Sequence, residues 1–134
     1  MTAAATPRRA EPQSELKAVA AAQAAMDKQA EDVVVMDLRA LSSVTDFFVL
    51  CTAGSAPQID ALREHVTVVF DRLGSPIRHI EGDGHGSSRS PSDPRWVLLD
   101  GGDVVVHLLD PRARAFYRLE ELWADAPRIT VPSN

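Results

Sequence analysis

Three carboxylates and one serine are the residues of this chain whose types and positions could carry catalysis. Glu81 ends a short alternating segment, and Asp100 and Asp103 flank a Gly-Gly pair. Grouped around a divalent metal ion, such carboxylates would suit a nucleotidyltransferase. Ser55 follows a glycine, but no histidine stands at a recognisable motif spacing from it.

Motifs that would identify a catalytic centre are missing from the chain. The patterns GxSxG, HExxH, CxxC and the phosphate-binding P-loop do not occur. Aspartates around a glycine pair are explained more simply as turn residues, because their side chains hydrogen-bond to the nearby backbone. We therefore predict that the protein is not an enzyme and that it uses no cofactor or metal ion.

The two aspartates belong to the strongest structural signal in the chain, the segment WVLLDGGDVVVH at residues 96–107. Two apolar runs joined by a glycine pair predict a β-hairpin with a two-residue turn. One face of the hairpin would then carry three pairs: Trp96 with His107, Leu98 with Val105, and Asp100 with Asp103. The opposite face is also apolar. One face therefore forms core, and the other needs a cover from a helix, a second copy of the chain or a partner.

Three helices are predicted in addition to the hairpin. The first spans residues 14–28 with Ser14 as its N-cap, and the second begins at the N-cap Ser55 and ends at Gly74. The third spans residues 111–123 and follows the N-cap Asp110. Residues at helical spacing mark the expected buried faces: Leu16, Val19, Ala20, Gln23 and Met26 in the first helix; Ile59, Leu62, Val66, Val69, Phe70 and Leu73 in the second; Phe116, Leu119, Leu122 and Trp123 in the third.

The remaining apolar runs predict the rest of the sheet. Residues 32–38 and 47–52 have the pattern of strands buried on both faces, and residues 77–81 alternate like an edge strand. The fold class is α/β, a single-domain mixed sheet of about five strands flanked by helices. We expect a disordered arm at 1–12, the domain at 13–127 with a flexible loop at 83–94, and a tail at 128–134.

Composition limits the possible functions. The 134 residues have a formal net charge of -5, which argues against broad RNA or DNA binding and is compatible with docking on a basic protein. No apolar run approaches the length needed to span a membrane. The single cysteine, Cys51, lies in an apolar run and is predicted to be a reduced core residue. These features predict a cytoplasmic protein.

Several segments, in order along the chain, resemble the ribosomal silencing factors, the family related to the plant Iojap protein. The resemblance extends from about residue 14 to residue 127. It is carried by EDVVVMD at 31–37, LSSVTDFFV at 41–49, EG at 81–82, WVLLD at 96–100, GDVVVH at 102–107 and FYRLEELW at 116–123.

The resemblance implies a nucleotidyltransferase-like fold without catalytic residues. Active members of that fold have a Gly-Ser followed by a carboxylate pair on the next strand, whereas this chain has Gly54-Ser55 but only Glu81 on that strand. The resemblance also implies binding to ribosomal protein uL14 on the large subunit, which would block joining of the small subunit and repress translation. Free members are expected to be homodimers. The loop at 83–94 is longer than usual for the family and is interpreted as an insertion.

The Trp96 face of the hairpin, with the helix that follows it, is the predicted surface for uL14. Arginine and tyrosine are enriched at protein interfaces, which favours adding residues from that helix. The predicted contacts are Trp96, Leu98, Asp100, Val105, His107, Arg114 and Tyr117. Two other functions stay open: a nucleotidyltransferase that uses Glu81, Asp100 and Asp103, and a dimeric adaptor for a different partner.

Overall fold

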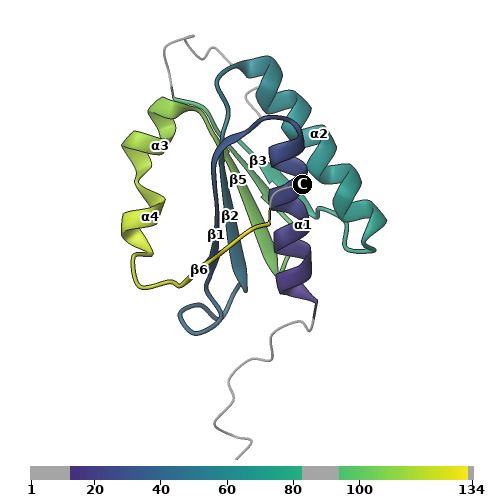
Figure 1. The fold of residues 1–134 in the computed structure, drawn as a ribbon, viewed down its shortest axis with the longest axis vertical. Helices are drawn as coiled ribbons and strands as arrows, with labels where there is room; N and C mark the ends of the chain where they lie inside the picture. The colour runs from purple at the N-terminus through teal and green to yellow at the C-terminus, as the bar shows by residue number, and fades with distance from the viewer. Residues whose placement is uncertain (1–12, 83–93, 133–134) are drawn as a thin grey trace, which may run out of the picture.

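The computed structural model describes residues 13–82 and 94–132, and a mixed β-sheet forms its centre (Figure 1). Within these residues the sheet has six strands in the order β3-β4-β5-β2-β1-β6. The elements are α1 (Ser14–Asp27), β1 (Glu31–Asp37), β2 (Phe47–Thr52), α2 (Ala56–Arg72), β3 (His79–Glu81), β4 (Trp96–Asp100), β5 (Val104–Leu109), α3 (Pro111–Tyr117), α4 (Leu119–Leu122) and β6 (Arg128–Ile129). The α/β class and the mixed sheet are confirmed. The arm at 1–12 and residues 83–93 of the loop lie outside the described residues.

The centre of the sheet is the pair β2 and β5, which run parallel, from Phe47 opposite Val104 to Thr52 opposite Leu109. The other four pairings are antiparallel. Strand β5 is buried along its whole length, as the near-continuous apolar sequence predicts for a central strand. Cys51 is buried in β2, also as predicted.

The far edge of the sheet extends beyond the prediction. Strand β6 pairs with β1, with Ile129 opposite Val35 and Arg128 opposite Met36. Val131 packs against the core next to it. The predicted tail therefore begins too early, because residues 128 and 129 complete a sixth strand.

The hairpin forms, but its predicted register is wrong. Asp100 pairs with Val105, Leu98 with His107, and Trp96 with Leu109, so each partner lies two residues later than expected. The connection is longer than two residues, and the Gly101 N–H donates to the carbonyl of Val104 at 2.9 Å. A slip of two residues leaves every side chain on its predicted face, because side chains alternate with a period of two.

Helices α1 and α2 cover one face of the sheet, which we call the closed face (Figure 1). The buried side of α2 agrees with the prediction at Leu62, Val66 and Phe70, but Leu73, also expected to be buried, is 40% exposed at the end of the helix. Ser55 caps α2 by accepting a hydrogen bond from the Gln58 N–H at 3.2 Å.

The buried side of α1 differs from the prediction. Leu16 is 63% exposed, and alanines face the sheet instead: Ala18, Ala21, Ala22, Ala24 and Ala25. Small side chains let the helix backbone lie close to the strands, so the alanine-rich side makes the contact. Ser14 is the first helical residue and Gln13 holds the N-cap position, so the predicted N-cap is also wrong.

Helices α3 and α4 lie on the other face (Figure 1). Asp110 caps α3 as predicted, accepting from the Ala113 N–H at 2.8 Å. The single helix predicted over 111–123 is wrong, because Arg118 adopts a left-handed conformation (φ 51°, ψ 49°) and separates α3 from α4. The break turns Phe116 and Leu122 outward and leaves Leu119 buried. None of the helices in the described residues is long and apolar enough to cross a membrane.

Candidate partner-binding site

Within residues 13–82 and 94–132, the face of the sheet opposite α1 and α2 is only partly covered, and we call it the open face. Strands β2, β4 and β5 contribute Phe48, Leu98, Val105 and His107 to it. A groove of about 440 Å³ lies here, and Trp123 contributes to its lining. An apolar groove with a few polar groups is the usual form of a binding site. Four residues predicted as contacts, Leu98, Asp100, Val105 and His107, line this groove together.

Trp96 joins the groove to the helical edge of the open face. Its ring lies 4.5 Å from that of Tyr117, measured between centroids. Its indole N–H donates to Nδ1 of His107 at 3.0 Å. Tyr117 is 42% exposed and contacts Phe116, whose side chain is 70% exposed. The predicted contacts Trp96 and Tyr117 are thus adjacent, and an aromatic surface extends from the groove onto α3.

His107 is the buried polar residue that Trp96 contacts. The residue is 2% exposed, and burial lowers the pKa of its imidazole to about 4. The ring is therefore neutral at neutral pH. An indole N–H can only donate, so the Nδ1 atom that receives it has no proton and the proton is on Nε2. This Nε2–H is buried and has no hydrogen-bond acceptor among the described residues.

Arg114 has a structural position within the same helical edge. Its guanidinium donates to both carboxylate oxygens of Glu120, at 2.8 and 3.0 Å, and so ties α3 to α4. It also donates to the hydroxyl of Thr52 at 2.8 Å and to the carbonyl of Asp32 at 2.9 Å. The hydrogen bonds from Arg114 hold the pKa of Glu120 below its usual range. These bonds indicate that Arg114 holds the helical edge in place, whereas Tyr117 leaves part of its ring exposed.

Several residues of the open face were not predicted as contacts. Phe48 and Trp123 line the groove, and their rings meet edge to face at 5.8 Å. Val44, in the turn between β1 and β2, lines it as well and is 83% exposed. Strand alternation could have placed Phe48 on this face, since its neighbours Phe47 and Val49 point into the closed face. Val44 gave a weaker signal, a single apolar residue within the polar turn Ser-Ser-Val-Thr-Asp.

The three carboxylates of the nucleotidyltransferase alternative are divided between two cavities. Glu81 and Asp100 line the groove on the open face. Asp103 lines a separate cavity of about 660 Å³ beside α1. The residues that the structure describes include no cluster of three or more metal-binding side chains. The predicted contact Asp100 also accepts a hydrogen bond from the Gly102 N–H at 2.8 Å, as an aspartate in a turn commonly does.

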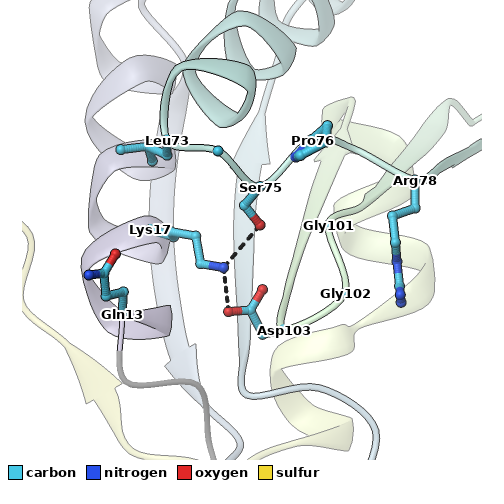
Figure 2. A pocket seen from close by; sticks show the side chains of 10 residues that line it. Gln13, Lys17, Leu73, Ser75, Pro76, Arg78, Gly101, Gly102 and Asp103 are labelled. Carbon is cyan, nitrogen blue, oxygen red and sulfur yellow. Dashed lines mark hydrogen bonds and ion pairs between the residues drawn. The ribbon is translucent and has the colours of Figure 1, made fainter.

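The cavity that contains Asp103 joins α1 to the hairpin turn (Figure 2). Lys17 points into it and meets the Asp103 carboxylate at 2.7 Å and the Ser75 hydroxyl at 3.0 Å. The side chains of Lys17 and Asp103 are only 12% and 9% exposed. Since these charges compensate each other, we assign them to the packing of α1 against the turn.

Comparisons of the sequence with known proteins all indicate one family. A family model described as ribosomal silencing factor during starvation matches residues 11–134. The chain is 38% identical over 105 residues to ribosomal silencing factor RsfS of Halalkalibacterium halodurans, covering 78% of this chain and 83% of that protein. It is 39% identical over 115 residues to the chloroplastic protein Iojap of Zea mays, covering 86% of this chain and 46% of that one.

A solved structure extends the likeness to the fold. A crystal structure of a protein from Chromobacterium violaceum superimposes with a TM-score of 0.72 at 29% sequence identity. The match covers 90% of this chain and 92% of the other.

Proposed function

The chain belongs to the ribosomal silencing factor family, and we propose that it represses translation by binding ribosomal protein uL14 on the large subunit through the open face. While bound, it would occupy surface that the small subunit needs, so that the two subunits fail to join. This mechanism is steric and takes place in the cytoplasm, where ribosomes assemble. It requires complementary surfaces and no catalytic group.

The groove on the open face is the observation that carries this proposal. Its lining is mainly apolar, and Val44 and Tyr117 stand exposed near it. Exposed apolar surface grouped around a groove is typical of protein interaction sites. Burying it against a partner would remove this surface from water, at roughly 25 cal/mol for each Å² of apolar area.

Charge supports a basic protein as the partner. Glu81 and Asp100 line the groove together with Arg78, which leaves its lining with an excess of negative charge, and the chain carries a formal net charge of -5. Proteins embedded in ribosomal RNA need basic surfaces to neutralise phosphate groups. An acidic partner would therefore approach such a protein faster and with better specificity than a neutral one.

Two matched valine variants test the proposal. Val44→Asp places a charge on the open face, and Val68→Asp places the same charge on α2, where Val68 is 37% exposed on the far side of the molecule. We expect Val44→Asp to weaken binding to purified uL14 by at least about tenfold, because a carboxylate would be buried in the interface. Val68→Asp should bind like the wild type.

Subunit joining is measured with the same proteins. Separated ribosomal subunits are mixed with wild type or variant, and full ribosomes are quantified by sucrose-gradient sedimentation. Wild type and Val68→Asp should lower the yield of full ribosomes, and Val44→Asp should not. Failure of the wild type to sediment with large subunits would reject the proposal and favour an adaptor for a different partner.

The open face also supports a homodimer in the absence of the ribosome. A second copy could cover the same apolar groove, so dimerisation and uL14 binding would exclude each other. Analytical ultracentrifugation should then show a dimer for wild type and a shift toward monomer for Val44→Asp. A dimer that Val44→Asp leaves intact would place the dimer contact elsewhere.

A further inference from the structure

The Nε2–H of His107 is a buried donor without an acceptor in the described residues, although nearly all such groups in proteins are paired. Trp96 determines which nitrogen carries the proton, because its indole N–H occupies Nδ1. The imidazole lines the groove on the open face, so the unpaired donor belongs to the same surface as the apolar contacts.

Phe48 packs directly against the imidazole that carries this donor. Its ring stands edge to face with the imidazole, at 69° and 4.5 Å between centroids. Phe48 is itself only half-buried and lines the groove. A buried donor denied both water and an acceptor destabilises the free protein, and any group that accepts from it recovers this energy.

We propose that His107 is a specificity-determining residue of the groove, which donates its Nε2–H to an uncharged oxygen of uL14, with Phe48 as the side chain that gives way. This inference rests on the proposed function, since it names the polar contact made within that interface. A partner that offers only apolar atoms at this position leaves the donor unpaired and binds less well.

The charges around the groove favour an uncharged acceptor over a carboxylate. Glu81 and Asp100 line the same groove together with Arg78, so the two carboxylates outweigh the one guanidinium and would repel a third carboxylate. A neutral imidazole offers no compensating charge to an anion buried beside it. A backbone carbonyl or a side-chain hydroxyl or amide oxygen satisfies the donor without this repulsion.

Two amide substitutions separate the two nitrogens of the ring. In His107→Gln, the terminal amide nitrogen reaches the place of Nε2 and keeps a donor there. In His107→Asn, the shorter amide replaces only the Nδ1 side, so it can still accept from Trp96 but leaves no donor at the place of Nε2. We expect His107→Asn to bind purified uL14 about tenfold more weakly than wild type, and His107→Gln to bind within about threefold of it.

Urea denaturation of both variants establishes that each is folded before its affinity is compared. Equal affinity of the two variants, whether near the wild-type value or far below it, would overturn the role of the Nε2–H. In that case wild-type binding to uL14 would still support the proposed function. A wild type that does not bind uL14 overturns both.

Nuclear magnetic resonance gives a readout that a purely structural role would not produce. In protein labelled with ¹⁵N at histidine, the His107 Nε2 proton should move downfield when uL14 is added, because a hydrogen bond to oxygen deshields it. The Nδ1 signal should stay that of an unprotonated nitrogen. An Nε2 proton that does not shift in the saturated complex would contradict the inference.

Discussion

The two faces of the sheet have similar strand sequences but different coverage. The closed face lies under α1 and α2, which have 14 and 17 residues. In the part of the chain that the structure describes, the helices on the open face are α3 and α4, with 7 and 4 residues, and α4 follows a break at Arg118. The closed face therefore forms the larger core, and the open face keeps a groove. Short covering helices, rather than unusual strands, therefore create the proposed binding surface.

Truncating one large side chain on each face should give the largest difference in stability between the two faces. Phe70 is fully buried in the closed face, and Phe70→Ala should lower the free energy of unfolding by about 4 kcal/mol through lost burial and the cavity that remains. Leu98 is only half-buried on the open face, so Leu98→Ala should cost about 1 kcal/mol or less. Urea denaturation monitored by circular dichroism measures both. Equal losses would show that the open face is as much core as the closed one.

The buried histidine should make the open face sensitive to pH. The pKa of His107 falls from 6.5 to about 4 on folding, so between these values the unfolded chain binds a proton that the folded protein does not. Stability therefore falls as pH decreases through this window, by about 3 kcal/mol in total, and is unaffected by this group above it. Urea denaturation from pH 7.5 to 4 should show a steeper loss for wild type than for His107→Gln. Parallel curves for the two proteins would mean that His107 is not held neutral.

Removing the ion pair between Arg114 and Glu120, which ties α3 to α4, should destabilise only the open face. Arg114→Met leaves the Glu120 carboxylate without its bidentate partner and should cost about 2 kcal/mol, because hydrogen bonds to a charged group are lost. Arg72→Met, on the exposed last turn of α2, is the matched control and should cost about 0.5 kcal/mol or less. Amide hydrogen exchange would locate the effect. Faster exchange in α1 or α2 of Arg114→Met would contradict this assignment.

The smallest expected effect is a gain in stability at Arg118, the break between α3 and α4. Arg118 adopts a positive φ of 51°, and its guanidinium, 67% exposed, lies 3.7 Å from the Glu121 carboxylate. Arg118→Gly removes the steric cost of the left-handed conformation and should raise the free energy of unfolding by about 1 kcal/mol. Thermal unfolding would detect the increase. A lower midpoint would show that the side chain of Arg118 contributes more than its exposure indicates.

Much of the fold could be predicted because sequence period and burial agree in its strongest elements. The apolar strands, the capped helix α2 and the alternation of hairpin faces follow from local rules. The alanine side of α1 could not be predicted, since hydrophobicity scales favour Leu16 whereas close packing favours Ala21 and Ala25. The break at Arg118 could not be predicted either, because the residue with the left-handed conformation is not a glycine.

Part of the candidate site could be predicted because side chains alternate between the two faces of a strand. Face alternation placed Trp96, Leu98 and His107 together despite the wrong register, because a shift of two residues conserves the face. The contribution of Val44 and Trp123 depends on how the turn and α4 fold over the sheet, which is tertiary information. The hydrogen bond that orients His107 likewise joins residues on two strands and has no local signature.

The parallel pairing of β2 with β5 also affects when the binding surface can exist. Phe47 lies opposite Val104, so the two central strands are separated by more than fifty residues of chain. Such a contact closes late, since a long loop must be ordered before the pairing stabilises it. During synthesis from the N-terminus, β2 therefore emerges long before its partner. A nascent chain has no assembled groove until β4 and β5 have left the ribosome that is making it.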